Sequence, residues 1–259
     1  MENILKKDGF ICDMDGVIYH GNKILPGVHE FISWLLENDK KFIFLTNSPE
    51  RTPQELSMKL RRMGLEVSAD HFYTSAMATA EFLHSQAPGC TAYVIGEPSL
   101  TKAMYDLGIY MNDVNPEYVV LGETRTYCFE KVEKAIELVN KGAKLIGCNP
   151  DTIGIMEKGV IPATGSLIAP IEIATGKKAY FVGKPNPLIV HKALNRIGCH
   201  SSEIAFIGDR MDTDVIAGIE SSLDTVLVLS GVTHQEDVDN FPYRPKYILN
   251  GICDLVNGL

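Results

Sequence analysis

Two aspartates near the start of the chain have the spacing of a catalytic pair. Asp13 and Asp15 follow the apolar run GFIC at 9–12 and precede Gly16. If a strand continued through them, both carboxylates would share one face, because side chains alternate along a strand. Gly16 would then let the chain turn away at once. One carboxylate could attack an electrophile while the other handles the proton of the leaving oxygen.

Polar residues follow three more apolar runs in the same way. They are Thr46 and Asn47 after 41–45, Lys184 after 179–182, and Asp209 with Asp214 after 204–207. The carboxyl ends of the strands form the ligand crevice of an open parallel sheet. We therefore expect these side chains to converge on one site with the first aspartate pair.

Such a site is suited to phosphoryl transfer. Several carboxylates together repel one another, so one must be protonated or a cation must lie among them. Ligands that are all oxygen favour a hard cation such as Mg²⁺. Mg²⁺, Lys184 and backbone N–H groups can balance a phosphate dianion, and the Thr46 hydroxyl can donate to a phosphate oxygen. In this chemistry the protein mainly positions groups and neutralises charge.

The apolar runs alternate with helical patterns. Continuous apolar runs indicate strands buried on both faces, and two more lie at 225–229 and 247–249. Apolar residues recur at helical spacing over 28–37, 53–63 and 188–197. This alternation predicts an α/β fold with a doubly wound parallel sheet, to which the run 179–182 would also contribute.

The middle of the chain repeats the pattern by itself. Strands are predicted at 92–96, 118–122 and 144–147, and helices at 98–107, 128–141 and 166–175. We therefore expect a smaller α/β domain at 81–178, inserted into a domain made of 1–80 and 179–259.

Four ordered motifs resemble those of the haloacid dehalogenase (HAD) superfamily. They are the DMDGV sequence at 13–17, Thr46-Asn47, the GKP sequence at 183–185, and Gly208-Asp209 followed by Thr213-Asp214. The DxDG form is similar to that of the superfamily's phosphatases, and the insertion resembles the large α/β cap that covers the site in one branch. The segments at 73–80, 122–125, 149–152 and 229–232 resemble NagD-type nucleotide and sugar-phosphate phosphatases. A Rossmann-like catalytic core with a cap for substrate specificity is what this resemblance implies.

The resemblance also implies a role for each motif residue. Asp13 would be the nucleophile and a Mg²⁺ ligand, and Asp15 the acid and base whose backbone carbonyl also binds Mg²⁺. Lys184 would stabilise the transition state, and Thr46 and Asn47 would hold phosphate oxygens. Asp209 and Asp214 would complete the metal site. In the inserted domain, the loop with Asn149 and Asp151 is expected to face the substrate, and the GETR sequence at 122–125 is a further candidate for contact.

Composition and charge narrow the possible partners and cellular location of the protein. The net charge of -9 argues against nucleic acid as a partner, and no apolar run approaches the roughly 20 residues that cross a bilayer. The six cysteines form no CxxC pair, which fits a reducing cytosol, and no signal sequence is evident at the start. We expect a cytoplasmic enzyme acting on a small phosphomonoester, either a nucleoside monophosphate or a sugar phosphate. The sequence leaves its oligomeric state open.

Two other functions use similar residues. A response-regulator receiver also combines a phosphorylated aspartate, Mg²⁺, a threonine and a lysine, but here the paired acids end the first strand and the nucleophile lies within that pair. A phosphomutase of the same superfamily shares Asp13 and Asp15, so the sequence discriminates poorly against it. There is no GxxxxGK[ST] and no GxGxxG, so neither a P-loop nor a dinucleotide site is indicated.

Overall fold

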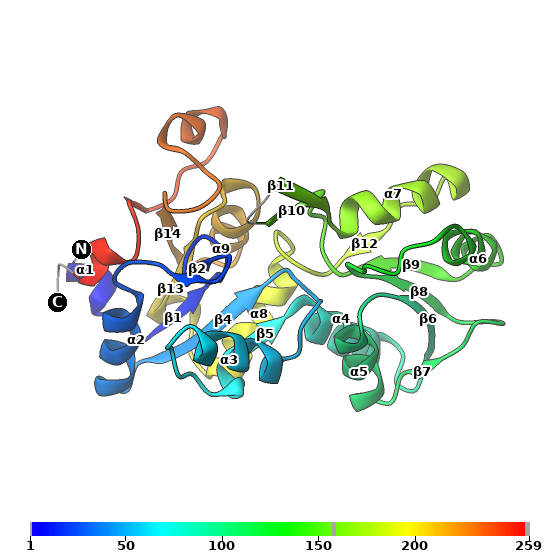
Figure 1. The fold of residues 1–259 in the computed structure, drawn as a ribbon, viewed down its shortest axis with the longest axis horizontal. Helices are drawn as coiled ribbons and strands as arrows, with labels where there is room; N and C mark the ends of the chain where they lie inside the picture. The colour runs from blue at the N-terminus through cyan, green and yellow to red at the C-terminus, as the bar shows by residue number, and fades with distance from the viewer. Residues whose placement is uncertain (1, 157–158, 257–259) are drawn as a thin grey trace. The chain divides into compact units, whose positions relative to one another are not determined.

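The computed structural model describes residues 2–156 and 159–256, and the chain divides into two compact units (Figure 1). The first unit comprises Met1–Thr46, Pro53–Tyr73 and Lys184–Leu259. The second comprises Asn47–Thr52 and Thr74–Gly183. The assignment of catalysis to 1–80 with 179–259, and of specificity to 81–178, stays a prediction.

Six strands form the main sheet of the first unit. They are β1 (Gly9–Cys12), β4 (Lys41–Thr46), β5 (Phe72–Thr74), β13 (Ile204–Gly208), β14 (Asp224–Val228) and β15 (Tyr247–Leu249). Their order is β15-β14-β13-β1-β4-β5, and β1 pairs in parallel with both β4 and β13. Along the chain, strands are added to one side of β1 as β4 and β5 and to its other side as β13, β14 and β15. The order of the strands therefore reverses between β1 and β13, and open α/β sheets bind their ligands at such a point.

Helices cover both faces of this sheet because its strands are apolar on both. Phe10 and Phe44 pack with the helices of one face, whereas Ile11, which alternates with them, points to the other. On that other face α8 contacts β4 and α9 contacts β14. The helices are α1 (Glu2–Leu5), α2 (Val28–Glu37), α3 (Pro53–Arg62), α8 (Pro187–Ile197), α9 (Ile216–Glu220) and α10 (Cys253–Val256).

Short elements complete the first unit. A small antiparallel hairpin pairs β2 (Tyr19–His20) with β3 (Lys23–Ile24), and a π-helical turn, Met211–Val215, follows β13. Short 3₁₀ helices lie at Ala69–His71, Ser201–Glu203 and Gln235–Asn240. The hairpin and the π-helical turn each follow a strand at the centre of the sheet, so they shape the region where the predicted site residues lie.

The second unit has its own five-stranded parallel sheet. Its strands are β6 (Thr91–Ile95), β7 (Tyr110–Met111), β8 (Tyr118–Leu121), β9 (Lys144–Gly147) and β12 (Tyr180–Phe181), in the order β12-β9-β8-β6-β7. Its helices are α4 (Ser75–Gln86), α5 (Pro98–Asp106), α6 (Phe129–Asn140) and α7 (Thr164–Thr175), and a hairpin pairs β10 (Ile153–Met156) with β11 (Gly159–Pro162). Within this unit α6 and α7 pack on one face of the sheet, opposite α4 and α5 (Figure 1).

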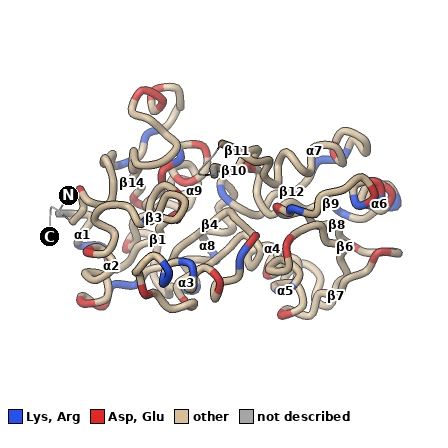
Figure 2. Tube along the Cα trace, in the orientation of Figure 1, with Lys and Arg blue, Asp and Glu red and all other residues tan. Residues whose placement is uncertain are grey.

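The outer surface of α6 is charged. Figure 2 shows acidic and basic residues together on this helix, and Lys134 and Lys141 both pair with Glu137. Such pairs at helical spacing support an exposed helix. Among the described residues, no helix has both the length and the apolar character that a bilayer crossing requires.

The predicted α/β class with parallel sheets is confirmed, but one strand was assigned to the wrong sheet. The run 179–182 was expected to extend the sheet of the first unit. Instead β12 pairs with β9 at the edge of the second sheet. A run this short and apolar is compatible with either sheet, so only the tertiary pairing decides between them. The sequence also gave no prediction for α4 or for the two hairpins.

Candidate active site

Asp13 lies at the carboxyl end of β1, at the centre of the main sheet. Its backbone N–H donates to the Ile207 carbonyl at 2.8 Å, so the pairing with β13 continues one residue beyond the strand. The strand itself ends at Cys12, and Gly16 takes a φ of 78°, which turns the chain away. Asp13 is 9% exposed whereas Asp15 is exposed, so the two carboxylates do not simply share one face of a continued strand.

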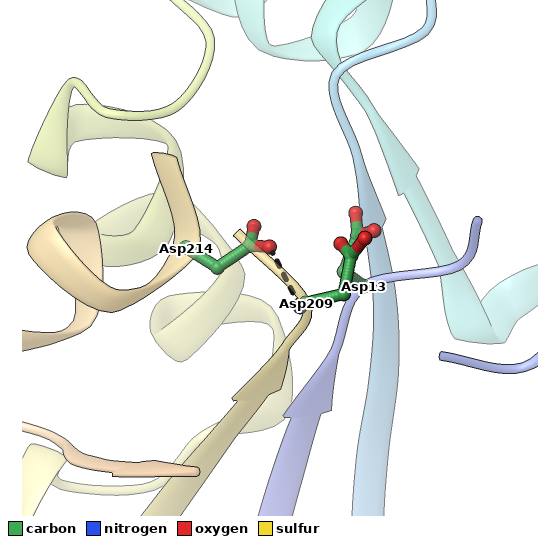
Figure 3. Close-up of side chains that lie close together, drawn as sticks. All are labelled: Asp13, Asp209 and Asp214. Atoms are coloured by element: carbon green, nitrogen blue, oxygen red, sulfur yellow. Dashed lines mark hydrogen bonds between the residues drawn. The ribbon is translucent and has the colours of Figure 1, made fainter. Parts of the chain in front are cut away.

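Asp209 and Asp214 reach the same place from the neighbouring strand (Figure 3). Asp209 follows β13, and Asp214 lies in the π-helical turn. The Asp214 Oδ2 atom accepts hydrogen bonds from the backbone N–H groups of Asp209 and Arg210, both at 3.1 Å. One carboxylate oxygen from each of Asp13, Asp209 and Asp214 lies within 4.8 Å of the others.

Lys184 supplies a positive charge to this cluster. Its ammonium pairs with Asp13 Oδ1 and with Asp214 Oδ1, the latter at 2.7 Å, and it donates to the Leu45 carbonyl at 3.1 Å. Lys184 is the first residue of the last segment of the first unit and precedes α8, so it reaches the carboxylates from a connecting segment and not from a strand of the main sheet. Burial by itself would lower the pKa of Lys184, but the carboxylates of Asp13 and Asp214 outweigh burial and raise it.

The cluster carries more negative than positive charge. Burial raises the pKa of Asp13 from 3.8 to about 7, although the Lys184 ammonium opposes the change. Burial, followed by repulsion from Asp13 and Asp214, also holds the pKa of Asp209 well above its usual value. Carboxylates that are this reluctant to ionise together fit a site that a cation completes. The three carboxylates offer oxygen donors only and can hold a divalent metal ion.

Close backbone packing fixes the position of Asp209. Its Oδ2 atom accepts a hydrogen bond from the Val232 N–H at 2.7 Å. A Cβ atom added to Gly231 would lie 1.9 Å from the same oxygen, so no other residue fits there without moving the carboxylate. The segment 229–232 resembles NagD-type phosphatases, but nothing in its residue types indicates that it holds Asp209.

Asp15 and Thr46 occupy different environments in the first unit. Asp15 is itself exposed, although the turn that follows it is buried, and its Oδ2 atom accepts a hydrogen bond from the Tyr19 hydroxyl at 3.1 Å. Thr46 is buried as the last residue of β4. Tyr19 could not be predicted from the sequence, because contact between side chains four residues apart in a non-helical turn leaves no periodic signal.

The remaining predicted residues form a hydrogen-bonded cluster in the second unit. The Asn47 Nδ2 atom donates to Asp151 Oδ2 at 3.0 Å, and Asn149 Nδ2 donates to the Asn47 carbonyl at 2.7 Å. The Asp151 N–H donates in turn to Asn149 Oδ1 at 3.1 Å. Asn149 is completely buried, so in this conformation it holds its neighbours in place, while Asp151 is partly exposed.

A buried carboxylate, Glu123, completes this cluster. Its Oε1 atom accepts hydrogen bonds from Asn149 Nδ2 at 3.0 Å and from the Thr164 N–H, at the start of α7, at 3.2 Å. Burial raises the pKa of Glu123 from 4.5 to about 7, against the opposing effect of these two hydrogen bonds. In the sequence analysis Glu123 was only part of a segment considered for substrate contact.

Family models match most of the chain. A haloacid dehalogenase-like hydrolase model covers residues 10–110, and a HAD-hydrolase-like model covers residues 181–255.

Individual relatives are similar over nearly their whole length. The dihydroxyacetone phosphatase of Corynebacterium glutamicum is 46% identical over 96% of this chain and 90% of its own. The ribonucleotide monophosphatase NagD of Escherichia coli K12 is 43% identical over 95% and 96%. A solved NagD structure from that strain matches with a TM-score of 0.91 at 42% identity, covering 96% of this chain and 98% of its own. A 4-nitrophenylphosphatase from Thermotoga maritima matches with a TM-score of 0.93 at 36% identity, covering 97% of both chains.

Proposed function

Because this chain belongs to the haloacid dehalogenase-like hydrolase family, we propose that it is a Mg²⁺-dependent phosphatase that hydrolyses small phosphomonoesters through a phospho-aspartate at Asp13. One observation carries the proposal. Asp13 follows β1 where the strand order of the parallel sheet reverses, and it is paired with a buried lysine and lies within 4.8 Å of two further carboxylates. In this proposal Asp13 is the nucleophile, Lys184 supplies the positive charge, and the three carboxylates offer oxygen ligands close to one another.

In the first step a carboxylate oxygen of Asp13 attacks phosphorus, and the bond from phosphorus to the ester oxygen breaks. Asp15 gives its proton to that oxygen, so the substrate leaves as an alcohol. In the second step Asp15 takes a proton from water, and the water oxygen attacks the phosphorus of phospho-Asp13. The bond from phosphorus to the Asp13 oxygen breaks, inorganic phosphate leaves, and both aspartates return to their starting states.

The positive groups lower the cost of bringing a phosphate dianion to a carboxylate. Lys184 contacts Asp13 directly, so it screens the nucleophile and stabilises charge on the transferred group. Asp13, Asp209, Asp214 and the Asp15 backbone carbonyl would hold Mg²⁺. When bound, the ion neutralises charge on the phosphoryl oxygens. The Thr46 hydroxyl and Asn47 would hold phosphate oxygens.

The names of two relatives support a proposal for the substrate class. One is named a dihydroxyacetone phosphatase and another a ribonucleotide monophosphatase, and both names point to small phosphomonoesters. We propose a sugar phosphate or a nucleoside monophosphate as substrate, with Asp151 as a contact and Asn149 acting through its hydrogen bonds to Asn47 and Asp151. We also propose that the enzyme acts in the cytoplasm.

Phosphate release from a panel of phosphomonoesters tests the proposal, with Mg²⁺ and with excess EDTA. We expect release with Mg²⁺, loss of release in EDTA and recovery when Mg²⁺ is restored. Asp13→Asn should abolish turnover while its circular dichroism spectrum matches the wild type. Retention of more than about a few per cent of kcat would remove Asp13 as nucleophile, and full activity in EDTA would refute the metal site. A phosphomutase would release little phosphate and would instead isomerise a member of the panel.

A further inference from the structure

Asp15 is an exposed carboxylate that must deliver a proton in a defined direction. An exposed aspartate samples several rotamers, and a misplaced acid loses much of its effect on the rate. In this structure one oxygen of Asp15, Oδ2, accepts a hydrogen bond from the Tyr19 hydroxyl at 3.1 Å. Tyr19 itself is only 3% exposed. The buried phenol therefore gives the exposed carboxylate a fixed point of attachment.

The backbone of the intervening turn brings the two residues together. The Gly16 N–H donates to the Tyr19 carbonyl at 2.9 Å, and Asp15 and Tyr19 form an isolated bridge. The Ile18 N–H donates to the Met14 carbonyl at 2.8 Å. Since Gly16 adopts a φ of 78°, the turn closes tightly without the strain that a side chain would cause there. Tyr19 then begins β2, so the hairpin fixes its backbone.

A lysine on the neighbouring helix α3 contacts the ring of Tyr19. The Lys59 ammonium, from α3, lies 3.5 Å from the centroid of the Tyr19 ring. A cation at this distance from an aromatic face is attracted to it. Tyr19 is therefore held at its backbone by the hairpin and at its ring by α3, while its hydroxyl contacts Asp15.

From this geometry we propose that Tyr19 is a positioning residue for the proton transfer by Asp15, an inference that rests on the proposed function. The phenol restricts rotation of the carboxylate by bonding Oδ2, so the other oxygen is presented in one direction to the ester oxygen of the substrate. When the bond from phosphorus to that oxygen breaks, the proton moves from Asp15 to the leaving oxygen.

The proposed role of Tyr19 can be tested by varying the leaving group of the substrate. An alkoxide is a strong base and needs a proton as it departs, whereas 4-nitrophenolate is a stable anion and departs without one. A loss of acid positioning therefore slows alkyl phosphates more than aryl phosphates. The ratio of kcat/KM for the two substrates measures this difference, because kcat/KM covers the steps through the first departure.

The experiment compares wild type and Tyr19→Phe with dihydroxyacetone phosphate and 4-nitrophenyl phosphate. We expect the alkyl-to-aryl ratio of kcat/KM to fall about tenfold in Tyr19→Phe, a part of the effect that general acids usually supply. Tyr247→Phe, in β15 of the same unit, is the matched control and should keep the wild-type ratio. An unchanged ratio in an active, folded Tyr19→Phe enzyme would overturn the inference, because a merely structural role would slow both substrates alike.

A second variant covers the case in which Tyr19→Phe does not fold. Lys59→Met keeps an apolar stem against the ring and removes the charge, so the ratio should fall in the same direction by a smaller factor. An unchanged ratio there would overturn the inference. Failure of the proposed function gives a different result, since wild type itself would then release no phosphate from either ester.

Discussion

Replacing Glu123 by glutamine should change how the free energy of unfolding depends on pH. Glu123 is 8% exposed, and burial raises its pKa from 4.5 to about 7. Below pH 4.5, the ordinary pKa, the carboxyl group is protonated in both the folded and the unfolded chain. As the pH rises from 4.5 to the pKa in the folded chain, about 7, the unfolded chain loses this proton first. The wild type therefore loses stability over this window, and the loss is complete above it.

The magnitude follows from the two pKa values. A pKa that differs by one unit between states corresponds to 1.36 kcal/mol, so Glu123 costs the folded wild type about 3 kcal/mol once it is ionised. Glutamine carries no charge, and its amide oxygen can accept the hydrogen bonds from Asn149 and Thr164 that Glu123 Oε1 accepts. The stability of the variant relative to the wild type should therefore increase by about 3 kcal/mol between about pH 4.5 and about pH 8.

Urea unfolding at several pH values measures this difference. Circular dichroism reports the unfolding of both units, and the fluorescence of Trp34, the single tryptophan of the sequence, reports the unfolding of the first unit. Glu133→Gln, at an exposed position of α6, is the matched control and should give a difference that stays nearly constant with pH. A difference for Glu123→Gln that is also constant would refute the reasoning, because it would mean that burial does not oppose ionisation of Glu123.

Two further substitutions test the site in the first unit. Lys184→Met leaves Asp13 and Asp214 buried without their partner, so the free energy of unfolding without metal should fall by about 3 kcal/mol. Lys192→Met, at a partly exposed position of α8, is the control and should change the free energy of unfolding little. Equal effects of the two variants in urea unfolding would contradict the importance of the buried pairs. Gly231→Ala places a Cβ atom 1.9 Å from Asp209 Oδ2 and must displace that carboxylate. Its affinity for Mg²⁺, measured by calorimetry, should fall at least about tenfold, and an unchanged affinity would argue against Asp209 as a ligand.

The predicted strands and helices account for most of the fold because their signals are local. The runs at 9–12, 41–45 and 204–207 are apolar without alternation, and this pattern arises when helices bury both faces of a sheet. The structure has strands at these positions, and they are adjacent in the main sheet. Polar residues directly after such strands must lie at one edge of a parallel sheet. Asp13 and Asp209 accordingly lie close together, with one carboxylate oxygen of each within 4.8 Å of the other.

Other features were not local and were missed. β12 is too short for its composition to indicate which sheet it joins, so the approach of Lys184 from a connecting segment was not foreseen. The contact of Tyr19 with Asp15 depends on a turn closed by backbone hydrogen bonds. The burial of Glu123 depends on Asn149 and on the start of α7, which are distant in sequence. None of these pairs has a spacing that periodicity can detect.

By itself, the sequence determined the α/β class and the acidic residues at the ends of the central strands, because apolar content and side-chain alternation are properties of each segment alone. Only the tertiary structure decided which sheet takes β12, which side chains restrain Asp15 and Asp209, and which carboxylate is buried in the second unit. Those outcomes depend on atoms brought within a few ångströms by folding, where desolvation and hydrogen-bond geometry act and sequence separation has no influence.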